Sequence, residues 1–453
     1  MGRITLQQAA QWCGGRIDPK YKDVTFLGAN NDTRKLEAGQ LFIDLKGERD
    51  GHAFIPNALE TGAAAVLCTH CDGDYPAIVV EDTRIALGCI ARGERERIGM
   101  KVVGITGSVG KSTTKEMVSA VLQSIYRISK TPANHNNDIG MPMAILAMPE
   151  DTQVAVLEMG MNHFREIAYL ASIGKPDIAV IINIGNMHIE HLGSMEGILQ
   201  AKLEILEGMK NNSCIILNGD DSLLWNQKKT GNMNAIYFGV RNPECTLLAQ
   251  NVLEENGELH FNVHRSNDTF PVELALEGQH YVHDALAAVA VGLELNVPIL
   301  KIQESLGQFQ NMSGRQEIFE KNGFTIIRDC YNAGPESMAA ALAVLGNKPG
   351  RHVAVLGDML ELGACTQAEH YRVGRIAAEK ADILLAYGPN SDRMLTGALT
   401  GGMSRTFARA FTDKERLVKI LRQLAKPGDV ILFKGSRGMR MEQVLEGFFQ
   451  EEK

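Results

Sequence analysis

The sequence has little of what marks several large protein classes. Eight cysteines are spread over 453 residues, too few for a disulfide-stapled scaffold and suited to a reducing compartment. Apolar runs such as Ile178–Ile182 are far shorter than the ~18 residues of a membrane helix, and the first residues hold no apolar signal core. Lysine and arginine number 46 against 54 acidic residues, without the basic excess of a nucleic-acid binder. We therefore expect a cytoplasmic protein with no membrane span and no nucleic-acid partner.

The residues that are present are typical of a large globular protein. Apolar residues make up 45% and charged residues 22% of the chain, the usual balance for folded cores with a charged surface. At roughly 150 residues per domain, the length predicts about three domains. The CxxC pair in Cys68-Thr-His-Cys71 lacks a second pair to complete four zinc ligands, so we expect two ordinary thiols beside a strand.

Strand and helix patterns divide the chain into three α/β regions. Residues 1–97 form a smaller N-terminal α/β region that ends in the charged run 92–97, which we interpret as a linker. Residues 98–312 alternate buried strands with helices, which predicts a parallel sheet like that of P-loop ATPases, and residues 313–453 form a doubly wound, Rossmann-like unit. The expected strands are 102–106, 154–158, 178–184, 214–217, 353–356, 383–386 and 430–433, and the expected helices include 285–293 and 299–309.

A phosphate-binding loop is the strongest chemical signal. A buried strand runs into Gly107-Ser-Val-Gly110-Lys111-Ser112-Thr113 and then into a helical pattern. Glycines let backbone N–H groups surround phosphate oxygens, the lysine reaches the β- and γ-phosphates, and the serine hydroxyl can ligate Mg²⁺. The standard motif has glycine where this chain has Ile105, but the strand, loop and helix keep their order. We therefore expect binding of a nucleoside triphosphate with magnesium.

Two further groups follow at strand ends, where open α/β sheets place their ligands. Glu158 ends the second strand and can ligate Mg²⁺, although a strand-end glutamate is also often a capping or solvated residue. His188 and His191 do not form the HExxH motif of zinc proteases. Each histidine, taken alone, fits a hydrogen-bonded structural role as well as a ligand role.

Lys202 stands at an unusual position. It lies between Ile198 and Leu206 on the i, i+4 row of a predicted helix, where a buried ammonium is unfavourable. From the pattern alone, the lysine either extends its amine to solvent along the apolar stripe or has a special chemical role.

Further motifs follow one another along nearly the whole chain. They are Asp32-Thr-Arg34, Gly39 to His52, Asn134 to Gly140, Glu158-Met-Gly160, Asn183 to His188, Ala201 to Ile205, Gly314-Arg315, Asp329 to Pro335, Leu356 to Gly363 with His370, and Lys434 to Gly438. Together with the phosphate loop, this series resembles the Mur ligase family. Two motifs resemble the tripeptide-ligase branch of this family in particular: Tyr331-Asn-Ala-x-Pro335 and Leu356-Gly-Asp-Met-Leu-Glu-Leu-Gly363.

The resemblance implies an activity and an assignment for each region. We expect an ATP-dependent ligase that adds D-alanyl-D-alanine to UDP-N-acetylmuramoyl-tripeptide (UDP-MurNAc-tripeptide) through an acyl phosphate, giving the pentapeptide precursor of peptidoglycan. Residues 1–97 would bind the uridine diphosphate sugar, residues 98–312 ATP, and residues 313–453 would close over the nucleotide and receive D-alanyl-D-alanine. Hinges near 98 and 312 would absorb the closure, and we expect the protein to act as a monomer.

The resemblance also implies the site residues. Those expected to bind ATP are Gly107, Gly110, Lys111, Ser112, Thr113, Asn137, Asp284, Arg315 and Asp329. Those expected to hold Mg²⁺, as two ions, are Ser112, Glu158, His188 and Lys202, the last resembling a lysine that is carbamylated in several Mur ligases. Those expected to bind substrate are Thr33, Arg34, Lys46, Gly47, Asp50, His52, Tyr331 and Asn332. The expected catalytic residues are Lys111, Lys202 and His188.

Three positions depart from the family pattern. Asp284 stands where the family usually has an asparagine that contacts adenine, and a carboxylate lacks the donors of an amide. Gly334 replaces an asparagine near the expected dipeptide site, and Ala133 replaces a glycine. Two other activities therefore stay open: a different ATP-dependent amide ligase, such as a folylpolyglutamate-type enzyme, and a nucleotide switch that forms no peptide bond.

Overall fold

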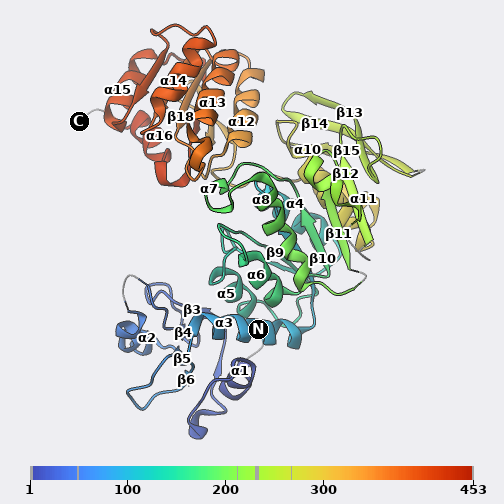
Figure 1. Cartoon of the computed structure of the whole chain (residues 1–453), viewed down its shortest axis with the longest axis vertical. Coiled ribbons are helices and arrows are strands. Elements are labelled where there is room, and N and C mark those ends of the chain that lie inside the picture. Colours follow the sequence, from blue (N-terminus) through green and yellow to red (C-terminus); the bar gives the residue numbers. More distant parts are fainter. Residues whose placement is uncertain (1–3, 48–49, 212, 230–233, 267, 451–453) are drawn as a thin grey trace.

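The computed structural model describes residues 4–47, 50–211, 213–229, 234–266 and 268–450. Figure 1 shows three parts that follow one another along the chain, with the central part between the N-terminal and C-terminal ones. No helix among the described residues combines the length and apolar character that crossing a bilayer requires. All eight cysteines are free thiols.

The N-terminal part is built on a small parallel sheet with strand order β3-β4-β5-β6, beside the antiparallel pair β1-β2. Its elements are β1 Ile4–Thr5, α1 Leu6–Cys13, η1 Pro19–Tyr21, β2 Thr25–Phe26, β3 Ala29–Asn30, β4 Leu41–Ile43, η2 Gly51–Phe54, α2 Ile55–Thr61, β5 Ala65–Cys68, β6 Ala77–Val79 and α3 Thr83–Ile98.

The charged run at 92–97 is not a linker, which corrects the sequence-based interpretation. It forms the last turns of α3, a helix that the Asp82 carboxylate caps and that ends at Gly99 in the left-handed region (φ 72°). Arg95 is buried and donates hydrogen bonds to the backbone oxygens of Gly174 and Lys175 at 3.0 Å each. The charged side chains therefore join the N-terminal and central parts instead of separating them.

The central part contains one sheet with strand order β15-β14-β13-β12-β11-β10-β7-β9-β8. Strands β8 to β13 are parallel, and β14 and β15 add an antiparallel extension that the sequence analysis did not predict. Its elements are β7 Lys101–Thr106, α4 Lys111–Gln123, β8 Ile128–Lys130, α5 Gly140–Leu146, β9 Val154–Glu158, α6 Glu166–Gly174, β10 Ile178–Ile181, α7 Ile189–Leu192, α8 Met195–Leu203, η3 Glu204–Gly208, β11 Cys214–Asn218, α9 Ser222–Trp225, η4 Asn226–Lys229, β12 Asn234–Gly239, β13 Leu247–Glu255, β14 Glu258–Arg265, β15 Asp268–Leu274, α10 Tyr281–Glu294 and α11 Ile299–Gly307.

The C-terminal part contains a sheet with strand order β16-β17-β21-β18-β19-β20, parallel except for β16. Its elements are β16 Glu317–Lys321, β17 Phe324–Asp329, α12 Pro335–Asn347, β18 Arg351–Gly357, η5 Gly363–Cys365, α13 Thr366–Lys380, β19 Ile383–Tyr387, α14 Ser391–Thr400, β20 Ala408–Phe411, α15 Lys414–Leu424, β21 Asp429–Lys434, η6 Arg437–Met439 and α16 Glu442–Phe449.

The expected strands and helices of the two larger regions are confirmed, and their cores explain the patterns. On β18, Val353 and Val355 belong to one buried cluster, whereas Ala354 and Leu356 belong to the cluster on the opposite face. A strand buried on both faces needs apolar residues at successive positions, which is why these runs do not alternate with polar residues. Strand β10 ends at Ile181, three residues earlier than expected, because the chain then turns beneath the phosphate loop.

Candidate active site

The phosphate loop joins β7 to α4 as the sequence predicts. Gly110 lies in the left-handed region (φ 87°) and precedes the first residue of α4, Lys111. The Lys111 ammonium donates to the backbone oxygens of Gly107 at 2.7 Å and Ser108 at 3.2 Å, so the side chain lies across its own loop. Burial lowers the pKa of Lys111 below its ordinary value. This lysine is therefore placed to exchange backbone partners for phosphate oxygens.

Asn183 supports the loop from the next strand of the sheet. Its Oδ1 accepts hydrogen bonds from the backbone N–H groups of Ser108 at 3.0 Å and Val109 at 2.9 Å, and its Nδ2 donates to the backbone oxygen of Val109 at 3.0 Å. Asn183 belongs to one of the motifs that resemble the family, but the sequence pattern assigns it no role. Its place at the carboxyl end of β10, the strand that pairs with β7, is the signal that identifies it.

Glu158 connects three segments at the end of β9. Its carboxylate accepts hydrogen bonds from the Ser112 hydroxyl at 2.7 Å and from Asn136 Nδ2 at 2.8 Å. The fully buried ammonium of Lys115 lies 3.7 Å from the same carboxylate and donates to the backbone oxygen of Thr131 at 2.8 Å. Glu158 is therefore a buried, tightly held carboxylate beside the serine expected to ligate magnesium, and not a solvated strand end.

Lys202 lies on α8 with only 2% of its surface exposed. This burial excludes the alternative in which the amine extends to solvent. No hydrogen bond or ion pair joins the amine of Lys202 to another residue within the described part of the chain, and Lys202 lines the same cavity as Lys111 and Glu158. Burial, with a contribution from the charge of Lys111, holds the pKa of Lys202 well below its ordinary value. The buried amine therefore lies in the cavity, and its charged form is disfavoured there.

His188 links the central part to the C-terminal part. It begins α7 with a left-handed backbone (φ 62°), and its Nδ1 lies 2.5 Å from the Glu361 carboxylate. Burial lowers the pKa of His188, and the charge of Lys111 lowers it further. A carboxylate on one ring nitrogen orients the imidazole and leaves the other nitrogen for a metal ion.

The C-terminal part supplies the second wall of the site. Arg315 donates from a terminal nitrogen to the Ser112 hydroxyl at 2.9 Å, and its guanidinium lies 3.9 Å from the centre of the Tyr331 ring. Asp329, at the end of β17, pairs with the buried Lys434 at 2.6 Å, and that ammonium also donates to the backbone oxygen of Asn332 at 3.1 Å. Positive groups from two parts of the chain thus converge on the phosphate loop.

These groups surround one cavity of about 390 Å³. Of the residues expected at the site, the cavity is lined by Gly110, Lys111, Ser112, Thr113, Glu158, His188, Lys202, Asp284, Arg315, Asp329, Tyr331 and Asn332. Two expected ATP-binding residues do not line it. Gly107 contributes its carbonyl to Lys111, and Asn137 uses Oδ1 to accept from the backbone N–H of Gly140 at 2.8 Å at the start of α5. Asn134 and Asn136 line the cavity in place of Asn137.

The side chain of Asp284 lies against the phosphate loop and the start of α4. It lies on α10 with 4% of its surface exposed, and its Oδ1 accepts a hydrogen bond from the Thr114 hydroxyl at 2.8 Å. A Cβ atom built on Gly110 would lie 2.6 Å from the same oxygen. Burial raises the pKa of Asp284 to about 7, although the Thr114 hydroxyl opposes this shift. Nearby, burial lowers the pKa of His280 to about 4, so this ring is neutral.

Gly334 lies where the C-terminal part meets the loop after β10. A Cβ atom built on Gly334 would lie 2.3 Å from the sulfur of Met187. The thioether of Met187 therefore occupies space that any side chain at position 334 would enter. The two residues also line the cavity, as Tyr331 and Asn332 do.

The residues expected to bind the sugar nucleotide lie outside this cavity, in the N-terminal part. Thr33 and Arg34 follow β3 in a turn. The exposed guanidinium of Arg34 donates to the Asp32 carboxylate from two nitrogens at 2.8 Å each. These bonds lower the pKa of Asp32 to about 2. The arginine is thus held in a fixed orientation at the surface.

The second half of that expected site is a turn around Asp50. Lys46 forms an isolated antiparallel bridge with Asp50 next to Gly47, and the Asp50 carboxylate accepts from the backbone N–H of His52 at 3.1 Å to start η2. Arg49, which belongs to the same motif, lies outside the described residues. The turn thus places Lys46, Asp50 and His52 close to one another.

Comparison with known proteins identifies the same units. The family model for the Mur ligase middle domain matches residues 105–292, and the model for the Mur ligase, glutamate ligase domain matches residues 314–437. The UDP-N-acetylmuramoyl-tripeptide--D-alanyl-D-alanine ligase of Bacillus subtilis is 39% identical, covering 99% of each chain. The ligase of the same name from Escherichia coli is 36% identical, covering 98% of this chain and 97% of that one.

Solved structures of related proteins superpose on this chain over nearly its full length. A crystal structure of MurF from Acinetobacter baumannii superposes with a TM-score of 0.92 at 31% identity, covering 100% of both chains. MurF ligase from Thermotoga maritima in complex with ADP superposes with a TM-score of 0.82 at 30% identity, covering 93% of this chain and 97% of that one. The three-part architecture is therefore shared with complete enzymes and not with an isolated domain.

Proposed function

Because this chain belongs to the Mur ligase family, we propose that it joins D-alanyl-D-alanine to UDP-MurNAc-tripeptide, converting ATP to ADP and phosphate. The product is the UDP-linked pentapeptide precursor of peptidoglycan. Relatives named for this reaction match nearly the whole chain, and one solved relative holds ADP. The observation that carries the proposal is the cavity in which the phosphate loop faces Arg315 and the Asp329–Lys434 pair.

The first step activates the acceptor acid. A carboxylate oxygen of the tripeptide attacks the γ-phosphorus of ATP, the bond to the bridging oxygen breaks, and ADP leaves as an acyl phosphate forms. Negative charge spreads over the phosphoryl oxygens in this step, and Lys111 and Arg315 are placed to offset it. Asn183 holds the loop backbone in the shape that receives the phosphates.

Four groups of the cavity fit two magnesium ions. Ser112 would hold one Mg²⁺, and Glu158, His188 and a carbamylated Lys202 would hold the second; these ions neutralise charge on the phosphates when bound. The fit rests on Lys202, because its amine is buried, has a lowered pKa and has no side-chain partner among the described residues. An uncharged amine adds carbon dioxide and loses a proton, which gives a carbamate with two oxygens of the kind that magnesium prefers.

The second step forms the amide bond. The amine of D-alanyl-D-alanine attacks the acyl carbon, a tetrahedral intermediate forms, and phosphate leaves while the nitrogen loses a proton. No protein nucleophile takes part, so the chain's task is to orient the reactants and exclude water. Tyr331 and Asn332 would bind the dipeptide, and the surface formed by Thr33, Arg34, Lys46, Gly47, Asp50 and His52 would bind the sugar nucleotide.

Release of ADP tests the proposal directly. We expect release only when UDP-MurNAc-tripeptide is present, faster release with D-alanyl-D-alanine added, and a product whose mass is the sum of the two substrates minus water. When the acceptor carboxylate carries heavy oxygen, one labelled atom should appear in the phosphate. Equal ADP release without the dipeptide, with no new product, would instead favour a nucleotide switch.

The remaining expectations belong to the same proposal. We retain the boundaries at 97/98 and 312/313, with hinges near both, a monomeric state and a cytoplasmic location. Scattering from solutions with and without nucleotide tests the hinges, and sedimentation tests the monomer. Cell fractionation tests the location.

A further inference from the structure

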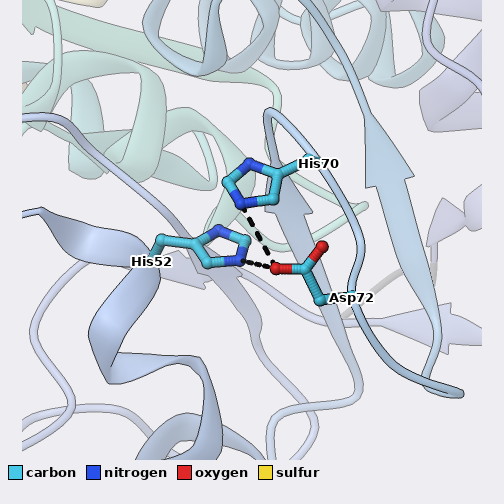
Figure 2. A group of neighbouring side chains, drawn as sticks. All are labelled: His52, His70 and Asp72. Carbon is cyan, nitrogen blue, oxygen red and sulfur yellow. Dashed lines mark ion pairs between the residues drawn. The ribbon is translucent and has the colours of Figure 1, made fainter.

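Three potential metal ligands meet at the carboxyl edge of the N-terminal sheet. His52 lies on η2, and His70 and Asp72 lie in the loop that follows β5 (Figure 2). One nitrogen of each histidine and one oxygen of Asp72 all lie within 4.8 Å of one another. We propose that His52, His70 and Asp72 bind one divalent transition-metal ion of the zinc type.

The distances fit a shared metal better than they fit direct hydrogen bonds. Nε2 of His52 lies 3.5 Å and Nε2 of His70 lies 3.4 Å from the same oxygen of Asp72. Both separations exceed the ~2.7–3.2 Å of ordinary N–H···O hydrogen bonds. Two ligands of a tetrahedral zinc ion, each bound at ~2.0–2.1 Å, lie about 3.3–3.4 Å apart. The two distances to Asp72 are thus already close to the edge length of a metal tetrahedron.

Proton counting also points to a cation at this place. Nδ1 of His52 lies 3.1 Å from the carboxylate of Asp44, which is almost completely buried and follows β4. A neutral histidine has a single N–H, and if it donates to Asp44, the lone pair on Nε2 faces the carboxylate of Asp72. Two facing lone pairs repel each other unless a proton or a metal ion lies between them. Asp44 would then orient His52, as carboxylates commonly do for metal-bound histidines.

The side chains have the freedom to complete the site. The rings of His52 and His70 are stacked, with centroids 3.8 Å apart and planes at 13°, so their lone pairs run side by side. His70 and Asp72 are exposed, so both side chains can rotate toward an ion bound at Nε2 of His52, whose ring is held by Asp44. Two imidazoles and a carboxylate suit zinc, whereas magnesium prefers oxygen ligands. Three protein ligands leave a fourth position open to water.

Zinc titration of the full chain tests the site. The chelator-treated protein is titrated with Zn²⁺ by calorimetry in excess Mg²⁺, which occupies the expected ATP site, and the absorption of bound Co²⁺ then reports the coordination geometry. We expect one equivalent to bind to the wild type, and at least tenfold weaker binding in His70→Ala and Asp72→Asn. Asp44→Asn should weaken binding by about 10–100-fold. His70→Ala and Asp72→Asn change exposed residues, so they should leave the melting temperature of the metal-free chain unchanged.

Two control variants separate this site from other metal-binding groups. His260 lies between the carboxylates of Glu258 and Glu273, each 3.7 Å away, on the distant strand β14. Both His260→Ala and Cys71→Ser should bind zinc as the wild type does. Equal affinity in wild type and Asp72→Asn would overturn the proposal, because Asp72 would then not be a ligand of the bound ion. Loss of binding in Cys71→Ser would also overturn it, by making a thiolate the ligand. The test reads metal binding alone, so it is independent of the ligase reaction.

Discussion

Replacing Asp284 with asparagine should make the protein more stable at neutral and alkaline pH. Asp284 is buried beside the phosphate loop, and burial raises its pKa from 3.8 to about 7. Between these two values the folded chain keeps a proton that the unfolded chain releases. The free energy of unfolding therefore falls as pH rises through this window, and it is fully lowered above the folded-state value.

The size of this effect follows from the pKa difference. A difference of 3.2 pH units between about 7 and 3.8, at about 1.36 kcal/mol per unit, gives at most about 4 kcal/mol at pH 8. Asparagine has no ionisable group, so Asp284→Asn removes the pH-dependent loss while its amide oxygen can still accept from Thr114. We expect the melting temperature of the variant to exceed that of the wild type by an amount that grows from pH 5 to pH 8.

Calorimetric scans of both proteins across this pH range provide the measurement. Asp220→Asn is the matched control. Burial acts to raise the pKa of Asp220, but hydrogen bonds from the His283 ring and from backbone N–H groups outweigh it and hold this pKa below its ordinary value. Its carboxylate therefore stabilises the fold at neutral pH, and the substitution should lower the melting temperature there. A difference between Asp284→Asn and wild type that does not change with pH would refute the reasoning.

Three further substitutions test the site. Lys202→Ala should reduce ADP release by about a hundredfold or more, and short-chain carboxylates should restore part of this activity. Lys210 is an exposed lysine close by in the sequence, and Lys210→Ala should release ADP as the wild type does. Full activity of Lys202→Ala would exclude the carbamate. Asn183→Ala removes three hydrogen bonds to the loop and should weaken ADP binding about tenfold or more, measured by calorimetry; unchanged affinity would show that the loop holds its shape alone. Gly110→Ala should lower stability by about 1–2 kcal/mol through its positive φ and further through the buried carboxylate oxygen 2.6 Å from the new Cβ. Gly402→Ala, with a positive φ and nothing within 4 Å, should show the φ effect alone, and equal melting temperatures of the two variants would contradict the clash.

The phosphate loop and the major strands could be predicted because they depend on local patterns. Buried parallel strands need continuous apolar runs, and a loop that binds phosphate needs glycine and lysine directly between a strand and a helix. The family motifs extended this reasoning to Arg315 and Asp329, which lie about 200 residues from the loop in the sequence but line the same cavity.

Other features depend on contacts that the sequence does not display. The charged run 92–97 looked like a linker because its charges suggest solvent, but Arg95 pairs with backbone oxygens of another segment. The side chain of Asn137 accepts a hydrogen bond from Gly140 at the start of α5 and does not line the cavity. The pairing of His52 with His70 could not be predicted, because His52 lies on η2 and His70 in the loop after β5, and only the parallel strands β4 and β5 bring these two segments together.

The contact between Gly334 and Met187 constrains how this enzyme can vary. A side chain at 334 has room only if the flexible thioether of Met187 shifts or a smaller residue replaces it. Residues accepted at the two positions should therefore depend on each other, with larger residues at 334 accompanied by smaller or flexible ones at 187. A library randomised at both codons and selected for growth would reveal this as a correlation between residue volumes.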